Sequence, residues 1–134
     1  MNALDKVSKY FFKPDAGLFI VRAATAYVFI EHGIAKVTNI AMPVAMMAHF
    51  GFPGWVGMFI AWLEVIGGVA LVLGIFTRVF AVAFMIEMIF AVFLTGFARG
   101  LGVHDLEILL ALNSGAIALA GSGKWRLTHL FEHA

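Results

Sequence analysis

The chain has no cysteine and few charged residues for its length. Its 134 residues include three prolines, and only 13% are Asp, Glu, Lys or Arg. Without cysteine the chain cannot itself form disulfides, thiolate metal sites, covalent c-type haem links or a dithiol redox centre. A soluble domain carries about twice this fraction of charge, so the charged side chains here are too few to cover a water-facing surface. A formal net charge of +1 gives no basic field for binding nucleic acid.

Apolar residues are abundant instead, and they are grouped in long runs. The chain is 63% hydrophobic, and its mean hydropathy is +0.99. Four apolar runs cover residues 17–36, 55–76, 79–97 and 104–120. About 20 apolar residues in a helix cross the roughly 30 Å hydrocarbon core of a bilayer, and the runs lack the alternation of membrane strands. The sequence therefore predicts an all-α membrane protein, a four-transmembrane-helix bundle forming one integral membrane domain over 1–134.

Two further helices are predicted outside these runs. Residues 37–54 contain the apolar stretch "NIAMPVAMMAHFGFPG", which predicts an interfacial helix between the first two spans, ending near Gly51 and Pro53. Near the N-terminus, Leu4, Val7 and Phe11 recur at helical spacing among three lysines, which predicts an amphipathic helix on the inner leaflet. No small-residue cleavage site follows an apolar core there, so we do not expect a cleaved signal peptide.

The basic residues predict the orientation in the membrane. If both termini are cytoplasmic, the inside carries six basic residues, Lys6, Lys9, Lys13, Arg78, Lys124 and Arg126. The outside then carries only Lys36 and Arg99. Because cytoplasmic loops are enriched in Lys and Arg, we expect a multi-pass protein with both termini in the cytoplasm.

Several ionisable residues nevertheless lie inside the predicted spans. They are Arg22, Glu31, His32, Glu64, Glu87, Asp105 and Glu107. A charge at mid-bilayer costs about 2.5–3.5 kcal/mol on insertion scales, so such residues usually face protein or a water-filled cavity. They can form a functional site, or they can be buried ion pairs that only fix helix packing. Both interpretations stay open at this point.

Helical phase sorts these residues into faces. At about 100° per residue, Lys36 and His32 lie on the side of the first span that carries Arg22, whereas Glu31 lies on the opposite side. The second and fourth spans each present one face of mostly small residues around a glutamate: Gly57, Ala61, Glu64, Gly68 and Leu71, and Glu107, Ala111, Ser114, Ala118 and Gly121. Small residues let helices approach closely, so we expect these faces to point inward.

The inward faces predict a polar cluster that binds a ligand. We expect His32, Lys36 and Glu107 near the outer edge, with Glu64 beneath them, and Arg22 either snorkelling inward or reaching toward Glu64. The candidate ligand-binding residues are therefore Arg22, His32, Lys36, Glu64 and Glu107. No residue is assigned a catalytic role.

Other site types have less support. Glu87 would mark an oligomer interface if it faced a neighbouring subunit. Of the five histidines, only His32 is expected in the core, so bis-histidine haem ligation is not expected. Met42, Met46 and Met47 near His49 are better explained by an interfacial helix than by a soft copper site. We therefore expect no metal site.

Two segments resemble a known family. The pattern of Arg22 followed by "FIEHGIAK" resembles the first helix of the DoxX family, and "LEVIGGVALVLGIFTR" at 63–78 closely resembles its second helix. Glu107 and the glycines Gly121 and Gly123 also fit this pattern. The resemblance implies a small four-helix protein of the bacterial cytoplasmic (inner) membrane. Members are associated with quinone-linked redox complexes, including thiosulfate:quinone oxidoreductase and a terminal quinol oxidase, and with assemblies that counter oxidative stress.

The resemblance and the polar cluster leave three hypotheses. The first is a subunit of a membrane redox complex that binds a quinone-like or other small amphipathic molecule. The chain has no covalently bound cofactor in this hypothesis, so electrons come from a partner or from the ligand. The second is a structural or assembly partner of another membrane protein, or a homo-oligomer, whose buried charges only fix packing. The third, a proton or solute carrier, is less favoured for four unbroken spans.

Overall fold

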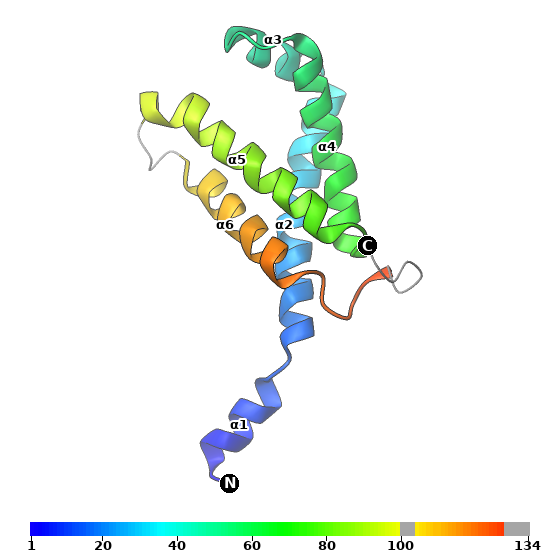
Figure 1. Ribbon diagram of the computed structural model, residues 1–134, viewed down its shortest axis with the longest axis vertical. Helices are drawn as coiled ribbons and strands as arrows, with labels where there is room; N and C mark the ends of the chain where they lie inside the picture. The colour runs from blue at the N-terminus through cyan, green and yellow to red at the C-terminus, as the bar shows by residue number, and fades with distance from the viewer. Residues whose placement is uncertain (100–103, 128–134) are drawn as a thin grey trace.

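The computed structural model describes residues 1–99 and 104–127 of the chain. Its elements in these ranges are six α-helices, and Figure 1 shows their arrangement. They are α1 (Ala3–Phe11), α2 (Pro14–Thr38), α3 (Ala41–His49), α4 (Gly54–Leu73), α5 (Thr77–Arg99) and α6 (Asp105–Ala120). The chain is an all-α membrane protein, as the composition predicts.

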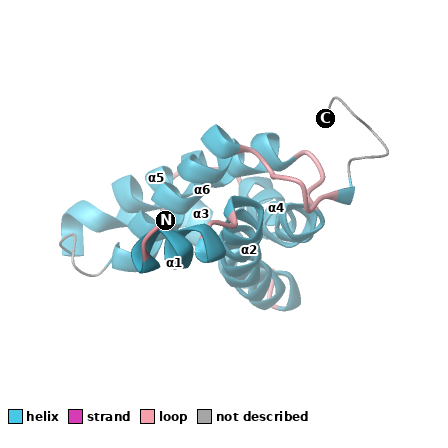
Figure 2. Cartoon of the chain, turned by 90° about the horizontal axis from the view of Figure 1, so that it is seen from below, coloured by secondary structure: helices cyan, strands magenta, loops and turns pink. Residues whose placement is uncertain are grey.

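The helices form two antiparallel pairs. Helix α2 packs along α4, and α5 packs along α6, whereas contacts between the two pairs are fewer. The α5–α6 pair is inclined to the α2–α4 pair in Figure 1, and the view from below in Figure 2 shows the pairs next to each other. Phe29 of α2 and Phe84 of α5 stack with ring centroids 3.8 Å apart at the centre of the core. The two pairs thus share a buried core but do not pack along their full lengths.

Three helices are long and apolar enough to cross a membrane. These segments are Pro14–Thr38, Gly54–Leu73 and Thr77–Thr95. Helix α6 has 16 residues, which at about 1.5 Å per residue extends roughly 24 Å, less than a typical hydrocarbon core. The fourth predicted span and the orientation of the termini therefore stay predictions.

The helix predicted at the N-terminus is present as α1. Asn2 accepts a hydrogen bond from the backbone N–H of Asp5 at 2.8 Å, and the Asp5 carboxylate accepts one from the Asn2 N–H at 3.2 Å. This reciprocal capping satisfies two amide groups at the helix start. None of the α1 residues is buried, so its apolar side chains are open to a membrane surface. The position of α1 on the inner leaflet stays a prediction, as does the interfacial position of α3.

The turn between α4 and α5 begins earlier than the hydropathy pattern suggests. The apolar run extends to Phe76, but α4 ends at Leu73 because Gly74 adopts a left-handed conformation with φ of 73°. The Ile75 N–H then donates to the Ala70 carbonyl at 2.9 Å, which is a typical glycine-stopped helix end. Thr77 and Arg78, which separate the second and third apolar runs, are the first residues of α5.

Glycines let α4 approach its neighbours closely. The second-span face that the sequence predicts to point inward is buried, including Gly57, Glu64 and Gly68. A Cβ atom added to Gly33 of α2 would lie 2.8 Å from the Val65 backbone nitrogen of α4. A Cβ added to Gly57 would lie 2.4 Å from the Pro43 carbonyl oxygen of α3. In both places backbone meets backbone, so only glycine fits.

Replacing Gly57 with alanine should separate α3 from α4. Because the clashing atoms are backbone atoms, the helices must move, and we expect a loss of about 1–3 kcal/mol of stability, as for overpacking in other cores. Thermal unfolding in detergent measures the loss. Gly17→Ala is the matched control, because a Cβ there would have no neighbour within 4 Å. Equal melting temperatures for the two variants would contradict the close contact.

Candidate intramembrane binding site

An ion pair joins α2 to α4 inside the helical region. Lys36 Nζ lies 2.6 Å from Glu64 Oε1, and the side chains are 18% and 2% exposed, respectively. Lys36 is in the last turn of α2, whereas Glu64 lies at the middle of α4. Gly33, one turn before Lys36, contacts α4 at Glu64 and Val65 and so brings the two side chains within reach. Two predicted site residues therefore contact each other directly.

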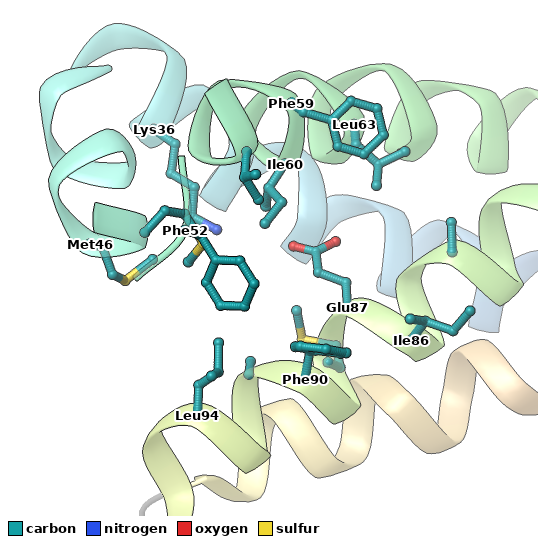
Figure 3. A pocket seen from close by; sticks show the side chains of 15 residues that line it. Lys36, Met46, Phe52, Phe59, Ile60, Leu63, Ile86, Glu87, Phe90 and Leu94 are labelled. Carbon is teal, nitrogen blue, oxygen red and sulfur yellow. The ribbon is translucent and has the colours of Figure 1, made fainter. Parts of the chain in front are cut away.

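Glu87 of α5 completes a group of three charges. Its carboxyl group lies next to that of Glu64 and near Lys36, and its Oε2 atom is buried. The sequence left Glu87 without a role, and a subunit interface was one interpretation. The structure instead points Glu87 toward the other helix pair, and Figure 3 shows its carboxylate directed into a cavity. We call Lys36, Glu64 and Glu87 the charged triad.

The first cavity lies between the α3–α4 segment and α5. Its volume is about 580 Å³, within the range of small-molecule sites. Lys36 and Glu87 are its charged lining residues. The remainder of the lining is apolar and includes methionine and phenylalanine side chains from several helices, namely Met46, Met47, Phe52, Phe59, Met88 and Phe90. An apolar chamber with charged groups at one point suits a molecule with an apolar body and a polar group.

A second cavity, of about 290 Å³, adjoins the first. Four of the five predicted site residues line it, namely His32, Lys36, Glu64 and Glu107. Six residues line both cavities, namely Lys36, Met46, Met47, Met88, Ala91 and Leu94. His32 is exposed, whereas Glu64 is buried. The second cavity thus extends from exposed polar groups to the buried carboxyl group of Glu64.

The burial of His104 was not predicted from the sequence. The expectation that only His32 lies in the core was wrong, because His104 is 6% exposed and His32 is exposed. His104 precedes the first turn of α6 and lies 3.6 Å from Glu107 and 3.5 Å from the Thr95 hydroxyl. Helical phase does not predict the direction of a side chain at a helix end. No simple signal in the sequence therefore distinguishes His104 from His32.

Arg22 lies away from this group and has different partners. Its guanidinium group is fully buried and donates to four backbone carbonyls. The acceptors are Leu71 and Val72 at the end of α4, and Ser122 and Trp125 after α6. Carbonyls at helix C-termini lack intrahelical donors and carry partial negative charge, so a buried cation is stabilised there. The expectation that Arg22 snorkels or reaches Glu64 was wrong, because these carbonyls occupy its donors.

A signal for Glu87 was present in the sequence. Ala83 and Ala91 lie four residues before and after it, on one helix face. Glu64 likewise shares its face with small residues, Ala61 and Gly68. A glutamate flanked by small residues at helical spacing is typical of a face packed against protein, and that pattern favours an inward Glu87.

The sequence model of the DoxX family matches residues 17–96. The chain belongs to the DoxX family. The matched region contains most of α2, all of α3 and α4 and most of α5, and hence all three residues of the charged triad. No solved structure shows a significant match to this DoxX protein.

Three relatives extend the similarity beyond the matched region. The Bacillus subtilis protein named "Putative oxidoreductase CatD" is 30% identical over 109 residues, covering 81% of each chain. An uncharacterized protein of Haemophilus influenzae is 35% identical over 120 residues, covering 89% of this DoxX chain and 81% of its own. The Escherichia coli inner membrane protein YqjF is 30% identical over 123 residues, covering 88% and 94%.

Proposed function

We propose that this DoxX protein binds a quinone-like or other small amphipathic molecule in the first cavity, as a subunit associated with a quinone-linked redox complex. The observation that carries the proposal is the cavity of about 580 Å³, whose apolar lining is interrupted by Lys36 and Glu87. In this proposal a ring or chain occupies the apolar part, and Lys36 donates a hydrogen bond to a carbonyl or hydroxyl group. The name of the Bacillus relative, which contains "oxidoreductase", supports a redox setting.

The proposed site modifies the set of residues chosen from the sequence. Lys36 remains in the lining, and Glu87 joins it. Glu64 lines the second cavity and contributes through its ion pair with Lys36. His32 and Glu107 line the second cavity and contribute from that side. Arg22 is omitted because its donors are held by carbonyl groups. The inner membrane of a bacterium is the proposed location, consistent with the name of the Escherichia coli relative.

The alternative is a structural or assembly partner without a ligand. Arg22 favours a structural role for at least one buried charge, because its guanidinium group ties three chain segments together. Glu87 does not favour this alternative, because it points into the cavity rather than toward a neighbouring chain (Figure 3). Native mass spectrometry from membranes separates the two: a bound small molecule supports the first, and a stable protein partner without one supports the second.

Filling the first cavity should abolish ligand binding. Ala83 is half-buried and lines only this cavity, so Ala83→Phe places an aromatic ring where the ligand would lie. We expect affinity for decylubiquinone, measured by isothermal titration calorimetry in nanodiscs, to fall by about tenfold or more, or at least 1.4 kcal/mol.

The same substitution at an exposed position is the control. Ala116 of α6 is exposed and lines neither cavity, so Ala116→Phe should bind decylubiquinone as the wild type does. Unchanged affinity in Ala83→Phe would remove the first cavity as the site. No binding of decylubiquinone or a menaquinone analogue to the wild type would contradict a quinone-binding function.

A further inference from the structure

The two cavities meet at the charged triad, and their linings differ in character. The first is apolar apart from Lys36 and Glu87, whereas the second is lined by His32, Lys36, Glu64, Thr95 and Glu107 as well as apolar groups. We infer that the second cavity is a water-filled proton path, which connects Glu64 with the aqueous face where His32 and Glu107 lie. Protons and the apolar ligand would then reach the triad from different sides.

Glu64 provides the first argument for water in this cavity. The residue is 1% exposed, and its Oε1 atom accepts from Lys36. Its Oε2 atom has no donor within the described ranges when the neighbouring Glu87 carboxyl group is ionised. A buried acceptor without a partner costs about 1–3 kcal/mol, and more for a charged group. Water fills a buried space when the space is large enough and offers two to four polar partners. A cavity of about 290 Å³ with five polar lining side chains meets both conditions.

Charge balance provides the second argument. The triad contains two carboxyl groups and one ammonium group, so it carries an excess negative charge when all three are ionised. Two carboxyl groups in a low-dielectric region favour sharing one proton, and that proton would make the triad neutral. A ligand that accepts or donates a hydrogen bond there changes this balance. The triad therefore needs exchange of a proton with water.

The ionisable groups that line the two cavities come from four helices. Helix α2 contributes His32 and Lys36, α4 contributes Glu64, and α5 contributes Glu87. From α6 comes Glu107, with His104 at 3.6 Å. Helix α3 contributes no ionisable lining residue to either cavity within the described chain. His32 is exposed and Glu107 is 32% exposed at its side chain, so these two residues bring the second cavity to the surface of the chain.

Hydrogen–deuterium exchange of the buried carboxyl groups tests the path without any ligand. Infrared spectroscopy after transfer to D₂O records the shift of the carbonyl-stretch band of a protonated carboxyl group. Glu64→Gln and Glu87→Gln identify the bands. In His32→Leu/Glu107→Leu the exchange should slow by about 100-fold or more, the lower end of what positioned acid–base groups contribute to proton transfer. Ala116→Phe, at a position that is exposed and lines neither cavity, should exchange at the wild-type rate.

A second variant keeps the test decisive if the double variant fails to fold. Leu106 is 43% exposed and lines only the second cavity, so Leu106→Trp should narrow the path while keeping the charges and should slow exchange in the same way. Wild-type exchange in both path variants, or equally slow exchange in Ala116→Phe, would overturn the inference. The inference rests on the proposed function only for the reason that protons are needed at the triad. Loss of quinone binding would leave the exchange of the carboxyl groups unchanged, and slow exchange would leave quinone binding unchanged.

Discussion

Replacing Arg22 with methionine should destabilise the protein by about 3 kcal/mol or more, because each buried carbonyl left without a donor costs about 1–3 kcal/mol. Four carbonyl groups lose the guanidinium donors together, two at the end of α4 and two after α6. Of these, the Leu71 carbonyl keeps the Gly74 N–H as a donor. Water cannot replace the donor in a lipid environment. For a chain of this size the melting temperature should fall by roughly 10 °C, as measured by circular dichroism in detergent.

Arg78→Met is the matched control for Arg22. Arg78 is exposed and donates to a single carbonyl, that of Ala118, at 3.2 Å. Exposed substitutions of this kind usually change stability by about 0.5 kcal/mol or less. If Arg22→Met unfolded at the same temperature as Arg78→Met, the carbonyl clamp would not contribute to stability, and Arg22 would again be available for another role.

The Lys36–Glu64 pair should behave differently when one partner or both are replaced. Lys36→Met leaves the buried Glu64 without its cation, and we expect a loss of about 3–5 kcal/mol. Lys36→Met/Glu64→Leu removes both charges, and apolar replacements of a buried ion pair are often neutral or stabilising. The double variant should therefore unfold near the wild-type temperature. Its affinity for decylubiquinone should nevertheless be lost.

The combination of measurements separates function from packing. If the double variant has wild-type stability but no longer binds decylubiquinone, the Lys36–Glu64 pair serves ligand binding. Restored stability with wild-type binding would show that neither Lys36 nor Glu64 takes part in the site. A double variant as unstable as Lys36→Met would contradict the expected replacement by apolar residues, and would identify the pair as a packing element.

Much of the helical architecture could be predicted from hydropathy and helical phase. The buried face of α4 and the outward direction of Glu31 follow from 100° per residue, because a regular helix preserves phase along its length. The resemblance to the DoxX family in 63–78 was confirmed by the family match. The ion pair between Lys36 and Glu64 could be suggested because both lie on inward faces at similar depths.

The remaining features depend on the packing between helices. Arg22 lies on the predicted face, but its partners are backbone carbonyl groups of two other segments. Every residue has a backbone carbonyl, so the pattern of side chains cannot indicate which ones accept from Arg22. His104 is buried and His32 exposed because α6 begins beside α5, a geometry that phase within one helix does not contain. The inclination between the two helix pairs creates both cavities, so neither could be predicted from any single segment.

The clamp at Arg22 has a mechanical consequence. It fixes α2, the C-terminal end of α4 and the segment after α6 to one another, whereas Lys36 lies fourteen residues farther along α2, a distance of about 21 Å at 1.5 Å per residue. The stacked rings of Phe29 and Phe84 join the two helix pairs between these two levels. Arg22 lines neither cavity. The part of the chain that holds the helices together is therefore separate from the part that would hold a ligand, so each can change without direct contact with the other.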